Sequence, residues 1–493
     1  MRGFPLPSLS LVPLLLAGAA SAAPGQAGRG GPDTPAARRL AELVRAVNTG
    51  SADSLRRYVS AGFSSASQAR LPAEERVERL LDIYGSSGGL AVKEVESPST
   101  TEASALVQGK RTESWGRLTV QVDGAVPHAI DRVGFGPASD PTVPARRLTD
   151  AEVVAQLKAH VERLAKSDDF SGTVLLAKHG KPLYSAAFGE ANKDFGARNR
   201  LDTKFNLGSM NKMFTAVAVA QLAEAGKLSF DDSLGKFLPA GTMRPEVLAK
   251  VRIKHLLTHT SGLGSYFTPE WDAMSRARFR TVDDWMPLVK AESLQFEPGT
   301  RWSYSNTGML VLGKVIEVAS GQDYFHYVRE HVYERAGMTN SDAYELDRVN
   351  PNLAVGYERR YTAAGVDVRN NIFVHVIRGG PAGGGYSTVE DLTRFAVALQ
   401  SGRLVRPASV RLLTSPKPEV ASPEYGYGFG VEEGGKIVGH SGGFVGINSQ
   451  LDIYPAEGYT LAVMSNYGGG AAPVVAKARA LLLAGRRATV SSR

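Results

Sequence analysis

Strand patterns lie at the two ends of the C-terminal two thirds of the chain, and mixed or helical patterns fill the region between them. Residues 170–177 and 181–188 have the pattern of a β-hairpin that turns at Gly180. Strand patterns return at residues 437–454 and 460–465. Segments from both ends of one domain are therefore predicted to meet in one sheet, and the residues between them to form an inserted helical lobe.

Residues 36–137 are predicted to form a separate small α+β domain. Apolar residues recur at helical spacing in three segments between Pro35 and Tyr84. The period then changes to two, which predicts four strands, at residues 91–95, 103–107, 117–122 and 129–133. Helices followed by a strand meander indicate a curved antiparallel sheet with helices on one face. The pattern is similar to nuclear transport factor 2-like, cone-shaped domains, and we expect an accessory module that can self-associate.

The other boundaries follow from composition. Met1–Ala23 has the pattern of a secretory signal peptide, because Arg2 precedes an apolar run and small residues stand before a cleavage site at Ala22. We therefore expect an exported protein, periplasmic or secreted, with no stable membrane span. The predicted segments are a signal peptide at 1–23, a flexible Gly/Pro/Ala-rich stretch at 24–35, the small domain at 36–137, a proline-rich linker at 138–148 and a second domain at 149–485.

Composition removes several classes of function. The chain has no cysteine, which excludes a disulfide framework, a thiolate metal site and a cysteine nucleophile. No His-Glu-x-x-His motif occurs, and we expect no metal and no other cofactor. Of the net charge of +8, five charges lie within residues 477–493, as a short basic tail typical of a solvated chain end. We expect a small-molecule or peptide substrate and no nucleic acid.

Ser209 and Lys212 form the first element that carries chemistry. They stand three residues apart at the start of a long apolar helix, so their side chains are predicted to lie one above the other. A serine hydroxyl becomes a nucleophile only beside a base, and a lysine can serve when its charge is destabilised. The N-terminus of a helix also favours developing negative charge. Alone, Ser-x-x-Lys is common and would indicate only the surface turn of a helix.

Two further elements follow in the chain. Tyr304-Ser305-Asn306 precedes an apolar helix and offers a phenol for proton transfer and an amide that can bind a substrate amide. Gly439-His440-Ser441-Gly442-Gly443 begins an alternating strand, and glycine at a strand edge lets a substrate backbone approach closely.

These three elements, in this order, resemble the serine β-lactamase and penicillin-binding protein superfamily. Tyr-Ser-Asn as the second element is typical of the class C β-lactamase-like branch, which includes D-Ala-D-Ala carboxypeptidases, D-aminopeptidases and esterases. Other stretches resemble the same branch, at residues 254–263, 298–300, 337–338 and 383–392. The resemblance spans roughly residues 150–485. It implies an α+β, β-lactamase-like transpeptidase fold, in which helices flank an antiparallel sheet beside a helical lobe.

The resemblance also implies a role for each residue. Ser209 would be the nucleophile that accepts the acyl group, and Lys212 and Tyr304 would share the proton transfers, with the identity of the general base left open. Asn306 would hold an amide of the substrate. The main-chain N–H groups of Ser209 and Gly443 would form the oxyanion hole, and the strand side of the site would consist of His440, Ser441 and Gly442. His255 and His259 lie in a stretch that the family uses as architecture.

The third element departs from typical β-lactamases, in which a lysine stands at the position of His440 and pairs with the substrate carboxylate. Histidine carries little charge at neutral pH. This difference favours a peptidase on D-amino-acid peptides or a carboxylesterase over a β-lactamase, and a non-catalytic receptor or scaffold is the alternative of another class. The aromatic residues within 264–295 either select the substrate or form the core of the lobe.

Overall fold

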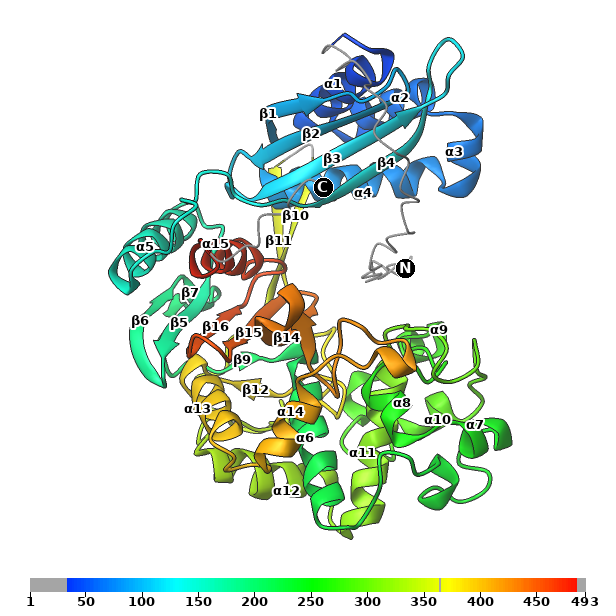
Figure 1. Cartoon of the computed structure of the whole chain (residues 1–493), viewed down its shortest axis with the longest axis vertical. Helices are drawn as coiled ribbons and strands as arrows, with labels where there is room; N and C mark the ends of the chain where they lie inside the picture. Colours follow the sequence, from blue (N-terminus) through cyan, green and yellow to red (C-terminus); the bar gives the residue numbers. More distant parts are fainter. Residues whose placement is uncertain (1–32, 363–364, 486–493) are drawn as a thin grey trace. The chain divides into compact units, whose positions relative to one another are not determined.

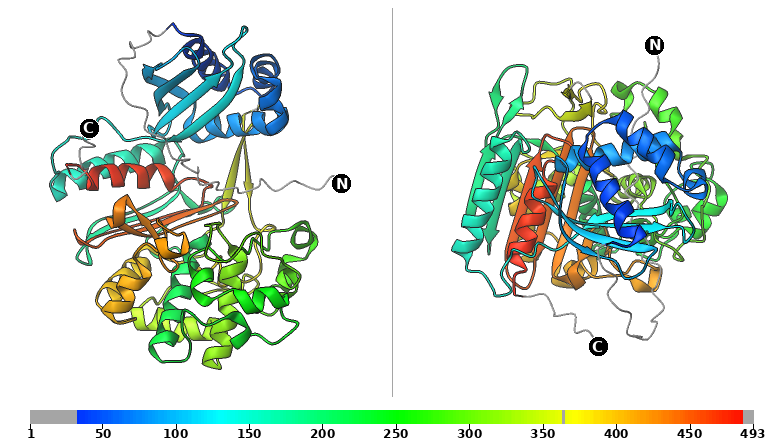
Figure 2. Two further views of the ribbon diagram at one scale, coloured as in Figure 1. Left: turned by 45° about the vertical axis from the view of Figure 1, so that its right-hand side comes forward. Right: turned by 90° about the horizontal axis from the view of Figure 1, so that it is seen from above.

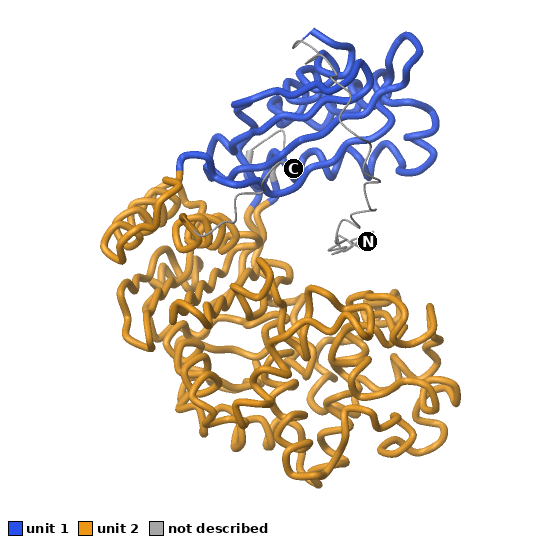
Figure 3. The backbone as a smooth tube through the Cα atoms, viewed as in Figure 1, with its two compact units in different colours: residues 1–142, 360–367 blue, residues 143–359, 368–493 orange. Residues whose placement is uncertain are grey.

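The computed structural model describes residues 33–362 and 365–485. The predicted signal peptide, most of the stretch at 24–35 and the end of the basic tail lie outside the described residues. The chain divides into two compact units (Figure 3), one running up to Thr142 and including Arg360–Asp367, the other comprising Val143–Arg359 and the residues from Val368 onward. The division at 142/143 falls inside the predicted linker, whereas nothing in the sequence assigned residues 360–367 to the first unit.

The first unit consists of helices followed by a meander (Figure 1). Its helices are α1 (Pro35–Asn48), α2 (Ala52–Gly62), α3 (Ser65–Arg70) and α4 (Ala73–Ser87), and its strands β1 (Leu90–Glu96), β2 (Glu102–Gly109), β3 (Trp115–Val122) and β4 (Ile130–Pro137) form an antiparallel sheet in the order β1-β2-β3-β4. Thr34 and Ser51 cap the first two helices. Alternate residues of β2 and β3 are buried against the helices, so the predicted helix-covered face is confirmed. The likeness to nuclear transport factor 2-like domains stays a prediction.

The second unit is built on a six-stranded antiparallel sheet. Its order is β13-β14-β15-β16-β5-β6, formed by β5 (Gly172–Lys178), β6 (Lys181–Phe188), β13 (Gly430–Glu432), β14 (Ile437–Phe444), β15 (Ile447–Tyr454) and β16 (Tyr459–Ser465). The first and last strand pairs of the unit meet where β16 pairs with β5, which confirms that both ends of the domain close one sheet. The predicted strand region 437–454 is two strands, because the chain reverses at Gly446 with φ +68°.

Helices cover both faces of this sheet (Figure 2). On one face, α5 (Asp150–Lys166) and α15 (Ala472–Leu482) pack through a shared apolar cluster onto β5 and β16. Thr149 and Glu152 form a reciprocal capping box at the start of α5, as the sequence around Thr149 indicates. The helical lobe lies on the other face. No helix among the described residues is long and apolar enough to cross a membrane.

The lobe contains one helix that is buried on every side, α6 (Asn211–Glu224). A helix that is apolar all round belongs at the centre of a domain. The other helices of the unit are α7 (Pro245–Lys250), α8 (Ile253–Leu257), α9 (Pro269–Ala273), α10 (Met286–Val289), α11 (Asn306–Ser320), α12 (Tyr324–Val328), α13 (Val389–Gln400) and α14 (Pro407–Leu413). Short strand pairs are β7 (Glu190–Asn192) with β8 (Ala197–Arg198), β9 (Phe205–Asn206) with β12 (Tyr386–Ser387), and β10 (Tyr357–Thr362) with β11 (Gly365–Asn370).

Candidate active site

Ser209 lies in a single 3₁₀ turn, η1 (Gly208–Met210), directly before α6. Its side chain is partly exposed, whereas the residues on either side of it are buried. Gly208 has φ +52°, and a β-carbon there would lie 2.7 Å from the main-chain nitrogen of Gly443. Only glycine therefore allows the turn that carries Ser209 to lie against β14. Ser209 therefore lies directly before the N-terminus of α6. At this position main-chain N–H groups can stabilise the negative charge that develops during nucleophilic attack.

Lys212 lies in the first turn of α6 and is completely buried. Its Nζ atom donates hydrogen bonds to Oδ1 of Asn306 (3.0 Å) and to the main-chain oxygen of Ala382 (2.6 Å). Burial holds the pKa of Lys212 well below its usual value. Two neutral acceptors thus orient the amine. No carboxylate is among the contacts described for Lys212, and burial without a carboxylate partner favours the uncharged form of a lysine.

Tyr304 connects the serine and the lysine. Its hydroxyl lies close enough to the side chain of Ser209 to interact with it, and its ring centroid lies 4.8 Å from Nζ of Lys212. Burial raises the pKa of Tyr304 above the usual value, so its phenol carries a proton at rest. Segments almost 100 residues apart thus bring a hydroxyl, a phenol and an amine into one group.

Asn306 is the first residue of α11, whose N-cap is Ser305. Its Oδ1 accepts the hydrogen bond from Lys212, and its Nδ2 donates to Oγ of Ser265 (3.2 Å). One N–H of the amide stays available for a substrate carbonyl, because an NH₂ group has two donors. Asn306 therefore also orients Lys212, a role that the sequence did not indicate.

Strand β14 brings the third element to the same place. Its partner β13 pairs only with Ile437–Gly439, so β13 leaves residues 440–444 unpaired on that side. A β-carbon on Gly442 would lie 1.9 Å from the main-chain oxygen of Leu207, whereas one on Gly443 would meet nothing within 4 Å. Gly442 therefore permits the contact with the Ser209 turn, and open space lies beside the Cα of Gly443. Ser441 is exposed.

His440 is buried, and both of its ring nitrogens are engaged. Nδ1 lies 2.6 Å from the main-chain oxygen of Ser441, and Nε2 lies 2.8 Å from the hydroxyl of Tyr425. A carbonyl oxygen only accepts, so Nδ1 carries the proton and Nε2 accepts from Tyr425. Burial, with Lys212 nearby, lowers the pKa of His440 to about 3. At neutral pH His440 therefore has no charge and no spare N–H to offer to a carboxylate.

The loop Gly379–Gly385 supports the Ser209 turn from the other side. The N–H of Leu207 donates to the oxygen of Gly385, and the N–H of Gly384 donates to the oxygen of Gly208. A β-carbon on Gly379 would lie 2.1 Å from Gly384, so the loop closes on itself without room for a side chain. The same loop supplies the Ala382 oxygen that binds Lys212. These glycines thus serve the architecture of the nucleophile turn.

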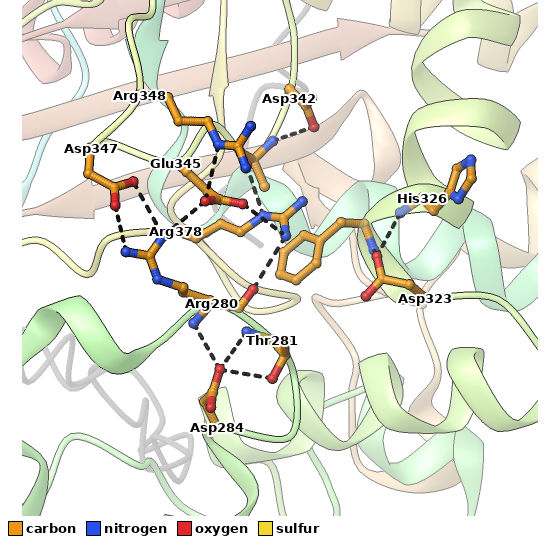
Figure 4. Close-up of polar contacts among 12 residues, drawn as sticks. Arg280, Thr281, Asp284, Asp323, His326, Asp342, Glu345, Asp347, Arg348 and Arg378 are labelled. Atoms are coloured by element: carbon orange, nitrogen blue, oxygen red, sulfur yellow. Dashed lines mark hydrogen bonds and ion pairs between the residues drawn. The ribbon is translucent and has the colours of Figure 1, made fainter.

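A charged network holds the entry to this loop (Figure 4). Arg378 directly precedes Gly379, lies 3.7 Å above the ring of Phe325 and approaches Glu345 at 3.8 Å. Glu345 also pairs with Arg280 (2.9 Å), which extends the network to Asp347. The network therefore ties three separate loops together at the start of the segment that positions Lys212.

The aromatic residues predicted within 264–295 divide into two groups. Tyr266, Trp271 and Trp285 are buried and form the core of the lobe. Phe267 is 44% exposed, and its ring stacks on Phe444 at 5.8 Å. Phe444 directly follows Gly443, so this pair is joined in the chain to the strand residues of the site.

Three contributors to the site were missed by sequence reasoning. They are Tyr425, the main-chain oxygen of Ala382 and the side chain of Ser265. No local pattern marks them, since each acts through a partner that is distant in the sequence. No group of three or more His, Asp or Glu side chains suited to a metal ion occurs in the described part of the chain.

A Ser-x-x-Lys turn, a Tyr-x-Asn segment and a His-Ser-Gly strand, gathered beside an antiparallel sheet, define a β-lactamase and penicillin-binding protein-like serine hydrolase site. The chain belongs to the beta-lactamase family, whose sequence profile matches residues 157–486.

The relatives include proteins of more than one kind. The chain is 32% identical over 330 residues to penicillin-binding protein 4* of Bacillus subtilis (strain 168), a match that covers 63% of this chain and 71% of that protein. It is 34% identical over 213 residues to esterase EstB of Burkholderia gladioli, covering 40% and 53%. Among solved structures, a penicillin-binding protein from Bacillus halodurans superposes with a TM-score of 0.59 at 32% identity, covering 65% of this chain and 99% of that one.

Proposed function

We propose that the protein is an exported serine hydrolase that forms a covalent acyl-enzyme on Ser209 and cleaves an ester or an amide. The observation that carries this proposal is that the ring of Tyr304, whose hydroxyl lies close to Ser209, is 4.8 Å from Nζ of Lys212, a fully buried lysine with a lowered pKa. When a serine, a phenol and an uncharged amine lie next to one another in this spatial order, they can move a proton off the nucleophile without a histidine.

The mechanism that we propose uses these three neighbouring side chains. The Ser209 proton passes to the phenol oxygen of Tyr304 as the phenol gives its own proton to the amine of Lys212. Oγ then attacks the substrate carbonyl carbon, and the N–H groups of Ser209 and Gly443 stabilise the oxyanion. The bond to the leaving group breaks as Tyr304 returns a proton to that group, and Lys212 returns its proton to Tyr304. Water repeats the same steps on the acyl-enzyme and releases the acid.

The charge state of His440 supports a substrate without a carboxylate next to the scissile bond. Its ring is neutral, buried and saturated by Tyr425 and Ser441. D-Ala-D-Ala peptides and β-lactams both carry a carboxylate near the bond that breaks, whereas simple esters and amides do not. The similarity to an esterase agrees with this choice. A class C-type β-lactamase is therefore the less favoured enzyme.

A matched pair of peptides tests the substrate class. One peptide ends in D-Ala-D-Ala with a free carboxylate, and the other is the same peptide with a C-terminal amide. We expect kcat/KM for the amide to equal or exceed that for the acid, and p-nitrophenyl butyrate to be turned over as well. A preference for the free acid of about tenfold, 1.4 kcal/mol, would show that the site binds a carboxylate.

The non-catalytic alternative has its own outcome in this assay. A receptor would bind a fluorescent penicillin and turn over none of the three substrates.

Export is expected to leave a mature chain that begins near Ala23 or Pro24, and N-terminal sequencing of native protein that found Met1 would contradict it. Self-association through the first unit stays a prediction.

A further inference from the structure

His259 holds the main chain on both sides of Tyr304. The main-chain oxygen of His259 accepts a hydrogen bond from the N–H of Ser303 (2.8 Å), and its Nδ1 accepts one from the N–H of Ser305 (3.1 Å). These two amides flank Tyr304 in the sequence. The imidazole ring also lies 4.3 Å from the ring of Tyr304. One residue therefore fixes the tyrosine by its backbone and by its ring.

The contact with Ser305 determines the state of the imidazole. A main-chain N–H only donates, so Nδ1 has no proton and Nε2 carries it. Nε2 has no hydrogen-bond partner in the described part of the structure, and the side chain is fully buried. Tyr304, Tyr425 and Trp302 surround the ring. Burial, with Lys212 and His440 nearby, keeps the pKa of His259 well below its usual value.

The backbone of His259 adds a second constraint. Its φ is +60°, in the left-handed region that few residues other than glycine and asparagine adopt readily. The residue at this position must therefore tolerate a positive φ and also supply an acceptor about two bonds beyond its β-carbon. Histidine, asparagine and aspartate meet both conditions, and full burial disfavours the charge of aspartate.

We propose that His259 is a positioning residue for the reaction. Its Nδ1 and its main-chain oxygen hold the segment Ser303–Ser305 so that the phenol of Tyr304 lies beside the side chain of Ser209. This inference rests on the proposed function, because it assigns His259 a task only where Tyr304 moves a proton. Ser305 transmits the same constraint to α11, since its Oγ accepts from the N–H of Gly308 (2.8 Å) and so caps the helix that begins with Asn306.

Two amide variants separate the nitrogens of the ring. In His259→Asn, the side-chain oxygen stands where Nδ1 stood and asparagine accepts the positive φ. In His259→Gln, the amide reaches the place of Nε2 and leaves the Ser305 N–H without a partner. Displacement of a catalytic group by about 1 Å can cost about 100-fold in rate. We expect kcat on p-nitrophenyl butyrate to fall by roughly 10- to 100-fold in the glutamine variant and by no more than about threefold in the asparagine variant, with KM little changed in both.

The double variant with Tyr304→Phe tests whether His259 acts through Tyr304. If it does, His259→Gln lowers kcat much less in the Tyr304→Phe background than in the wild type, because coupled residues are not additive. Circular dichroism and thermal unfolding establish that each variant is folded.

Each outcome bears on a different statement. Equal losses in the asparagine and glutamine variants, or a larger loss in asparagine, would overturn the positioning role, the latter by pointing to Nε2 as a donor. Additive losses with Tyr304→Phe would also overturn it. Retained turnover in Ser209→Ala refutes the proposed function itself, whereas an inactive Ser209→Ala with a fully active His259→Gln refutes only this inference.

Discussion

Ser209→Ala is expected to abolish turnover of p-nitrophenyl butyrate while the protein stays folded. The substitution removes only Oγ from a partly exposed side chain, so the free energy of unfolding should change by no more than about 1 kcal/mol. Loss of a serine nucleophile costs roughly 10⁴-fold or more in kcat, because the groups that serve it have no reaction left to assist. Steady-state kinetics on purified protein measures the loss.

Ser60→Ala provides the matched control. Ser60 is exposed on α2 of the first unit and is not one of the residues assigned to the site. The same chemical change at this position should leave kcat and KM unchanged. Ester hydrolysis by the Ser209 variant at more than about 1% of the wild-type rate would assign the chemistry to another residue.

Tyr304→Phe is the second substitution with a large expected effect. It removes the phenol oxygen and keeps the ring, which packs against His259 at 4.3 Å. If the phenol moves the proton between Ser209 and Lys212, kcat should fall by roughly 100-fold or more, the usual scale for the loss of general acid–base catalysis. KM should change little, because the oxygen is assigned to proton transfer and not to substrate binding.

Separate measurement of kcat and KM for Tyr304→Phe distinguishes a role of Tyr304 in proton transfer from a role in substrate binding. A raised KM with unchanged kcat would make Tyr304 part of the binding surface. Normal values of both parameters would show that the proton reaches Lys212 by another route.

Local patterns predicted most of the fold. The hairpin around Gly180 and the capping residue Thr149 appear where the sequence indicates them. Closure of the sheet by both ends of the domain followed from the position of strand patterns along the chain. These features depend on neighbours in sequence or on simple periodicity, which is why they can be found without coordinates.

The supporting parts of the site could not be predicted in the same way. The sequence shows that His440 replaces a lysine, but only the fold shows that Tyr425 saturates its ring. The same holds for the Ala382 oxygen on Lys212, which reflects a main-chain position and no side-chain identity. Gly356 and Gly446 illustrate a further limit, since their need for glycine comes from close approaches that no local pattern records.

His259 shows how a motif can be located without its purpose being known. The sequence around His259 is a motif typical of the family, and a buried imidazole there would ordinarily be taken as part of the core. The two hydrogen bonds to the amides beside Tyr304 give it a specific task.

Covalent labelling of Ser209 is the most direct measurement. Incubating the full-length protein with a fluorophosphonate, followed by peptide mass spectrometry, identifies the residue that acts as the nucleophile. The expected result is one phosphonyl group on Ser209, with loss of ester hydrolysis in proportion to labelling and no label on Ser209→Ala. A label on a different residue, or full ester hydrolysis by protein that takes up no label, would contradict an acyl-enzyme mechanism at Ser209.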